Sequence, residues 1–114
     1  MKLNDIGLQI ATRELQVNGK KVTVVIGRPE KFPDGQDYFC PYQILGMGDE
    51  KVSYAGGVDA VQSLQLALKK IGTDLYTSTE YRTKQLCWDG SDSGELGFPV
   101  PDSIRDLAPG LSGL

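Results

Sequence analysis

The sequence predicts an α+β fold, in which an antiparallel sheet of four to five strands carries one main α-helix packed on one face. Two observations support this prediction. Residues 58–72 form the only long segment with a clean helical repeat of apolar side chains, and residues 8–55 resemble strands separated by turns, arranged as two hairpins. The length of 114 residues suits one domain, so we treat residues 1–114 as a single domain.

The helix is predicted from apolar side chains that recur every three or four residues. These are Ala60, Val61, Leu64, Ala67, Leu68, Ile71 and the following Leu75. Asp59 places a carboxylate at the positive end of the helix dipole, and Gly72, after two lysines, marks the predicted C-terminal end. Leu66 breaks the pattern. Either the apolar segment near the C-terminus covers it, which we favour, or it marks a partner surface.

The first hairpin is predicted from residues 8–17 and 21–27, two strand-like segments joined by Asn18-Gly19. This dipeptide is a strong signal for a type I′ turn, because both residues tolerate positive φ. The turn also determines the strand register, which places Leu15 opposite Val22.

Arg13 falls on the apolar face of this hairpin, opposite Val24 in the same register. One explanation is a β-bulge near Arg13-Glu14 that turns the charge outward, because Leu8 and Ile10 follow the opposite alternation from Leu15. The other is an inward arginine that belongs to a site. We favour the bulge.

The second hairpin is predicted from residues 38–45 and 51–55. Pro41 lacks a backbone N–H, so we expect the first of these strands to lie at an edge of the sheet or to be bulged at this residue. Gly56-Gly57 follows the second strand and is interpreted as a tight turn into the helix, because no phosphate-binding glycine motif surrounds it.

The remaining segments are less regular. Residues 28–37 are a polar connection, and residues 73–83 carry no predicted element. Residues 84–88 are predicted as a short fifth strand, and residues 96–101 as an extended apolar segment whose prolines disfavour a helix. Residues 102–107 are predicted to form a short helical turn.

Composition excludes several classes of function. The net charge of −3 argues against binding to nucleic acid or to anionic membranes, and no apolar run is long enough to span a bilayer. The N-terminus lacks the apolar stretch of a signal peptide, so we expect a cytoplasmic protein. Cys40 and Cys87 are expected to be free buried thiols rather than a disulfide.

The chain contains no histidine, which removes Ser-His-Asp and Cys-His catalytic sites and most zinc sites. An enzyme would have to use Asp, Glu, Lys, Tyr or Cys side chains, for example carboxylates together with Arg13, and no catalytic or cofactor motif is present. We therefore predict no catalytic residue, no cofactor and no metal. Asp89, Asp92 and Glu95 resemble a calcium loop only loosely, because their spacing does not match the EF-hand, and a solvated loop is favoured.

Two motifs resemble those of a small bacterial family of unknown function. They are YAGGVDAVQ at residues 54–62, continued by LQLAL and IG in the helix, and LGFPVP at residues 96–101. The resemblance covers most of the chain. It implies a bacterial, cytoplasmic, single-domain protein, and it carries no assigned activity and no catalytic residue.

We expect a non-catalytic binding protein, with two hypotheses for what it binds. The first is an inhibitor or immunity-type protein of a bacterial toxin system, whose acidic loops meet a basic toxin or nuclease. Its candidate contact residues are Trp88, Asp89, Asp92, Glu95, Asp34, Asp37, Asp49 and Glu50. Trp88 is either a core residue, which we favour, or an anchor at such an interface.

The second hypothesis is a small-molecule binding module, with its ligand between the sheet and the apolar segment of residues 96–101. The candidate contacts are the aromatic side chains of Tyr42, Tyr54, Trp88 and Phe98. An apolar cavity at this position would favour this hypothesis.

Overall fold

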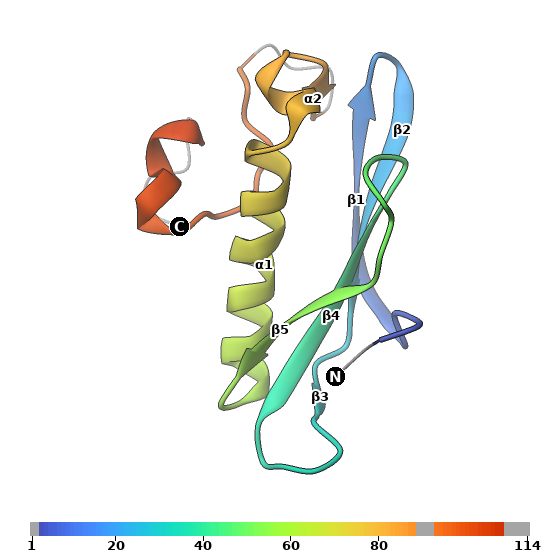
Figure 1. Cartoon of the computed structure of the whole chain (residues 1–114), viewed down its shortest axis with the longest axis vertical. Helices are drawn as coiled ribbons and strands as arrows, with labels where there is room; N and C mark the ends of the chain where they lie inside the picture. The colour runs from blue at the N-terminus through green and yellow to red at the C-terminus, as the bar shows by residue number, and fades with distance from the viewer. Residues whose placement is uncertain (1–2, 89–92, 109–114) are drawn as a thin grey trace.

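The computed structural model has the predicted α+β architecture, an open antiparallel sheet with one long helix against one face (Figure 1). It describes residues 3–88 and 93–108. The strands are β1 (Gln9–Val17), β2 (Lys20–Gly27), β3 (Glu30–Lys31), β4 (Tyr38–Leu45), β5 (Ser53–Gly57) and β6 (Leu86–Cys87). The helices are α1 (Ala60–Tyr76), α2 (Thr79–Arg82) and the 3-10 helix η1 (Asp102–Leu107). The short elements β3 and α2 were not predicted, because neither is long enough to show a periodic pattern.

The sheet runs from β5 through β4, β2 and β1 to β6. β3 continues the line of β2 and pairs with the far end of β4. The predicted register of the first hairpin is confirmed, with Leu15 opposite Val22 and Arg13 opposite Val24. Asn18 and Gly19 both have positive φ, at 51° and 79°, as a type I′ turn requires.

The predicted bulge near Arg13-Glu14 is wrong. The register shifts between Gln9 and Ala11, so Ile10 is the extra residue. This bulge explains the opposite alternation at the start of the strand and leaves Arg13 on the inner face. β1 pairs with β6 only at its end, so most of its outer edge has no described partner strand. A bulge and an inward charge are both features that keep such edges from pairing with other chains.

The strand of Pro41 was predicted to lie at an edge or to be bulged at this residue, and the first alternative is wrong. β4 pairs with β5 on one side and with β2 and β3 on the other. On the latter side the pairing with β2 ends at Tyr42 and the pairing with β3 begins at Phe39. Pro41 therefore lies in the gap between two partner strands, where its missing N–H interrupts no ladder on that side.

Helix α1 begins where the sequence indicates. Asp59 is the N-cap, and its carboxylate accepts a hydrogen bond of 2.8 Å from the Gln62 N–H. The predicted turn at Gly56-Gly57 lies instead within β5, where a Cβ on Gly57 would stand 2.5 Å from the Ser63 nitrogen. Gly57 thus lets the strand pass close to the first turn of the helix.

The prediction that the helix ends at Gly72 is wrong, because α1 continues to Tyr76. Gly72 is buried inside the helix, and a Cβ on it would lie 2.1 Å from the Pro99 carbonyl oxygen. The glycine is therefore needed for the close approach of a distant segment. We call residues 96–100 the C-terminal segment.

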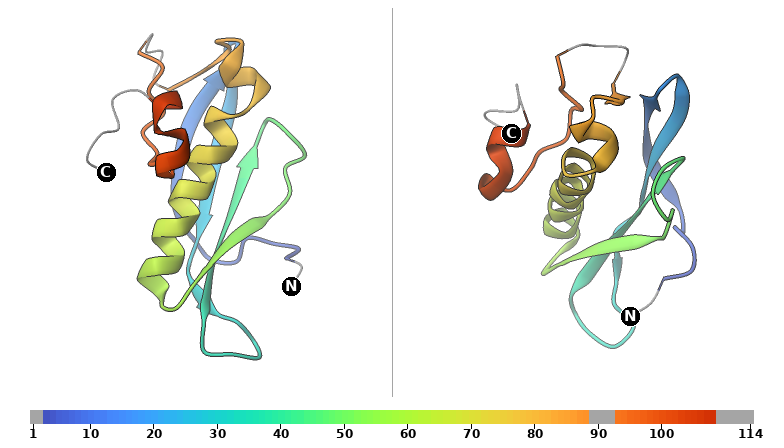
Figure 2. Two further views of the ribbon diagram at one scale, coloured as in Figure 1. Left: turned by 60° about the vertical axis from the view of Figure 1, so that its left-hand side comes forward. Right: turned by 45° about the horizontal axis from the view of Figure 1, so that its top comes forward.

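The C-terminal segment belongs to the core. Leu96, Phe98 and Val100 are buried, and the Leu96 N–H donates to Tyr76 Oη at 2.8 Å. Figure 2 shows residues 93–108 running along the flank of α1 near its C-terminal end. Because alternate residues point inward, the segment closes the space between the helix and the β1 side of the sheet.

The predicted apolar stripe of α1 is confirmed in its second half and wrong at its start. Ala67, Ile71 and Leu75 are fully buried, whereas Val61 is 62% exposed. Ser63, predicted on the polar face, is buried instead, and its hydroxyl donates to the Ala60 carbonyl at 2.9 Å. This bond explains how a polar side chain is accommodated against β5.

Candidate functional site

A groove of about 740 Å³ lies between β1, helix α1 and the C-terminal segment. Its lining residues are Ala11, Thr12, Arg13, Ile26, Gln62, Gln65, Leu66, Leu68, Lys69, Gly97, Phe98 and Pro99. Leu66 is 40% exposed, so the C-terminal segment leaves it partly open on the groove instead of covering it as predicted. The groove combines three distant parts of the chain and is mainly apolar.

Arg13 links the sheet to the C-terminal segment at one end of the groove. Its Nη1 donates to the carbonyl oxygens of Leu96, at 3.3 Å, and Gly97, at 2.8 Å. Its guanidinium carbon lies 4.2 Å from the ring centre of Trp88 and 4.8 Å from that of Phe98. These aromatic contacts stabilise a cation in a partly apolar place.

Burial lowers the pKa of Arg13, since desolvation disfavours the charged form, and the neighbouring Tyr76 opposes this effect. Arginine remains charged at neutral pH. The hydrogen bonds to the C-terminal segment and the two ring contacts show that the Arg13 side chain points inward, which is the second of the two predicted positions. It carries a positive charge at the rim of the groove.

Gly97 makes this arrangement possible. Its φ is +77°, and a Cβ would lie 2.5 Å from Arg13 Nη1 and 2.6 Å from the Trp88 ring. No other residue can place a backbone carbonyl so close to the guanidinium without displacing the ring. Trp88 itself is partly buried, packing against the core while stacking on Arg13.

The groove is lined by two cations, Arg13 and Lys69, and by no acidic side chain among the described residues. Lys69 is exposed, and its ammonium has no ion pair within residues 3–88 and 93–108. Gln62 and Gln65 add polar groups along the same side of the helix. The groove is thus positively charged in a protein whose net charge is −3.

The acidic residues predicted to contact a partner lie in separate places. Asp34 and Asp37 are exposed in the loop between β3 and β4, at the lower end of the molecule in Figure 1. Asp49 and Glu50 lie in the turn between β4 and β5, where their carboxylates accept hydrogen bonds from the backbone of the same turn. Glu95 lies beside the C-terminal segment.

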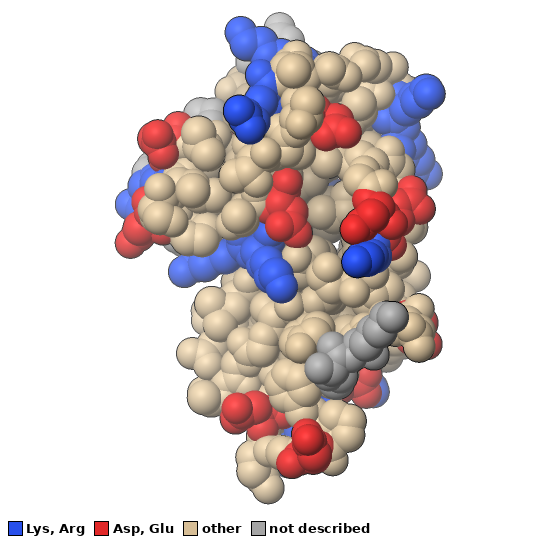
Figure 3. All heavy atoms as spheres, viewed as in Figure 1, with Lys and Arg blue, Asp and Glu red and all other residues tan. Residues whose placement is uncertain are grey.

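Asp89 and Asp92 lie outside the described residues. Figure 3 shows the acidic side chains of one face in several small groups, with basic groups between them. The described candidates therefore do not form one acidic patch, and those of the β4–β5 turn stabilise local structure.

The aromatic residues predicted around a small molecule are only partly brought together. Phe98 lines the groove and Trp88 stacks on Arg13 beside it. Tyr54 packs instead against Phe32, with ring centres 5.9 Å apart. Tyr42 lines another hollow, of about 340 Å³, and donates a 2.7 Å hydrogen bond to Asp74. Burial and this carboxylate raise the pKa of Tyr42, so its phenol stays neutral.

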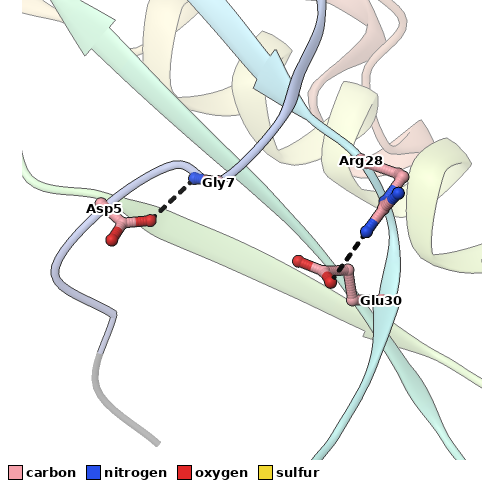
Figure 4. A network of polar contacts seen from close by, with 4 residues as sticks. All are labelled: Asp5, Gly7, Arg28 and Glu30. Carbon is pink, nitrogen blue, oxygen red and sulfur yellow. Dashed lines mark hydrogen bonds and ion pairs between the residues drawn. The ribbon is translucent and has the colours of Figure 1, made fainter.

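The cysteines and the exposed ion pairs of the described residues lie outside the groove. Within the described part of the chain no group of three or more potential metal ligands is found. Cys40 and Cys87 are free thiols, and burial raises the pKa of Cys40 to about 11, which keeps that thiol protonated. Figure 4 shows Asp5 accepting from the Gly7 N–H and Arg28 paired with Glu30 at 3.2 Å. Both contacts join exposed residues that are close in the chain, so they contribute little to stability.

Among the described residues no helix is long and apolar enough to cross a membrane. In the comparison with protein families, residues 11–100 match DUF6968, a domain of unknown function. The chain matches no curated protein and no solved structure. The matched range runs from β1 through the C-terminal segment and includes every residue that lines the groove. The chain therefore belongs to the DUF6968 family, a domain of unknown function.

Proposed function

We propose that this protein is a non-catalytic binding module whose ligand occupies the groove between β1, α1 and the C-terminal segment. The observation that carries the proposal is the groove itself. Its volume of about 740 Å³ lies within the range typical of small-molecule sites, and its walls are apolar with a few polar groups at the rim.

The construction of the groove also supports a ligand site. Its C-terminal wall is fixed by hydrogen bonds from Arg13 to two carbonyls and by Gly72, which lets Pro99 approach the helix. A wall held in this way is largely formed before a ligand arrives, so binding costs little ordering entropy.

The inhibitor or immunity-type hypothesis stays a prediction. It needs acidic side chains that act together on a basic partner. The described candidates lie in separate loops, and the turn acids Asp49 and Glu50 already accept backbone hydrogen bonds. The groove gives the small-molecule hypothesis the more specific support.

A fragment screen by two-dimensional amide NMR tests the proposal. We expect hits to shift amide signals of residues 11–13, 62–69 and 97–98 together. Leu66→Trp should weaken these hits, since a large ring would fill a groove that Leu66 lines.

Val61→Trp is the matched control, because Val61 is 62% exposed on the same helix and does not line the groove. Hits that shift signals only elsewhere would contradict the proposal. So would hits that bind the Leu66→Trp protein as tightly as the parent.

A further inference from the structure

We infer that the groove selects organic anions with an apolar body, whose charged group is received by Arg13 and Lys69. This inference rests on the proposed function and adds the chemical class of the ligand. It follows from the charge of the groove, from the incomplete pairing of Arg13 and from the arrangement of the apolar wall.

The charge of the groove opposes that of the whole protein. Arg13 and Lys69 line it without any acidic side chain from the described residues, although the chain has 15 acidic and 12 basic residues. A concave surface of one sign concentrates ions of the other sign. A cationic ligand would be repelled by Arg13 and Lys69, and a neutral ligand would form no ion pair with either side chain.

The Arg13 guanidinium has hydrogen-bond donors that remain available for a ligand. The guanidinium carries five N–H groups, and both of the hydrogen bonds that it makes to described residues come from Nη1 and go to neutral carbonyls. No carboxylate within residues 3–88 and 93–108 forms an ion pair with it. A partly buried cation gains most from an anion, and the planar fork of arginine suits a carboxylate.

The apolar wall determines the rest of the ligand. Leu66 and Leu68 come from the helix, Phe98 and Pro99 from the C-terminal segment, and Ile26 from the sheet. A hydrocarbon chain or a ring on this wall is removed from water, which supplies the main binding energy. The ligand class is therefore a carboxylate attached to a hydrophobic body.

Calorimetric titration with octanoate and with its neutral analogue octanamide tests the inference. The two probes share the apolar chain and differ in charge. We expect octanoate to bind about tenfold more tightly at low salt, and the difference to shrink at about 0.3 M salt because screening weakens the attraction.

Lys69→Gln should weaken octanoate about threefold, as expected for an exposed ion pair, and leave octanamide unchanged. Lys20→Gln is the matched control. It removes the same charge from an exposed position in β2 that does not line the groove, and it should bind octanoate like the parent.

Equal binding of octanoate and octanamide would overturn the inference but leave the groove as a binding site. An equal loss of octanoate binding in the Lys69→Gln and Lys20→Gln proteins would also overturn it, because the effect would then come from net charge. If neither probe binds, the inference is wrong. The fragment screen then decides separately whether the groove binds ligands at all.

Discussion

The substitution Gly72→Ala tests whether the C-terminal segment is seated as described. At an ordinary interior position of a helix, replacing glycine with alanine stabilises a protein by about 1 kcal/mol. At Gly72 the new Cβ would stand 2.1 Å from the Pro99 oxygen and 3.0 Å from Val100 Cγ1. The Pro99 carbonyl would have to retreat by more than 1 Å to reach ordinary contact.

The cost of such crowding is typically about 1–3 kcal/mol. Complete release of the segment would cost more, since each of the buried side chains of Leu96 and Phe98 contributes about 1.5–3 kcal/mol. We therefore expect the segment to shift instead of detaching. After the gain of about 1 kcal/mol in helix propensity, the free energy of unfolding should fall by up to about 2 kcal/mol.

Urea unfolding followed by circular dichroism and by the fluorescence of Trp88 measures this change. Trp88 is the only tryptophan and lies against Gly97, so its emission reports on the segment. The pair Gln65→Gly and Gln65→Ala, at an exposed position of the same helix, gives the propensity difference alone. A Gly72→Ala protein more stable than the parent by about 1 kcal/mol would refute the reasoning.

Three further predictions follow from single contacts. Asp59→Ala should lower the free energy of unfolding by about 1 kcal/mol in urea titrations, because the helix N-cap is lost, whereas Asp59→Asn should stay close to the parent. Leu66→Asp should leave a cooperative thermal transition, since this side chain is 40% exposed, whereas Ile71→Asp, which buries a charge, should abolish it. The free energy of unfolding should fall from about pH 9 to pH 11, because the unfolded Cys40 thiol ionises at lower pH than the folded one, whose pKa is about 11. Cys40→Ala should remove about 2–3 kcal/mol of that decline, and equal pH profiles of the two proteins would contradict the burial of the thiol.

The parts of the fold that depend on local chemistry could be predicted from the sequence. Asn18-Gly19 specifies a turn through its own backbone preferences, and the turn then determines the register of β1 and β2. Asp59 caps α1 through an amide three residues away. In both cases the interacting groups are neighbours in the chain.

The errors arose where a distant segment decides the outcome. Gly72 would end an isolated helix, but here it lies under Pro99. Arg13 would be an unsuitable inward residue of a lone hairpin, but carbonyls and aromatic rings of the C-terminal segment accommodate it. Pro41 is tolerated in a central strand because two different strands share one side of β4.

The candidate site could be predicted only in outline. The expected position, between the sheet and the apolar segment, and one lining residue, Phe98, agree with the groove. Lys69 could not be identified as a groove residue from the sequence, because lysines are common on the polar face of a helix. Its position becomes informative only when the C-terminal segment is seen to lie opposite it. The acidic loops drew attention through composition alone, and composition does not say which loops meet in space.

The claim that the groove receives an organic anion is tested most directly by nuclear Overhauser contacts between bound octanoate and the isotope-labelled protein. The account predicts contacts from the methylene beside the carboxylate to Arg13 and Lys69, and from the terminal methyl group to Leu66. Contacts confined to the hollow beside Tyr42, or a reversed orientation in the groove, would contradict it.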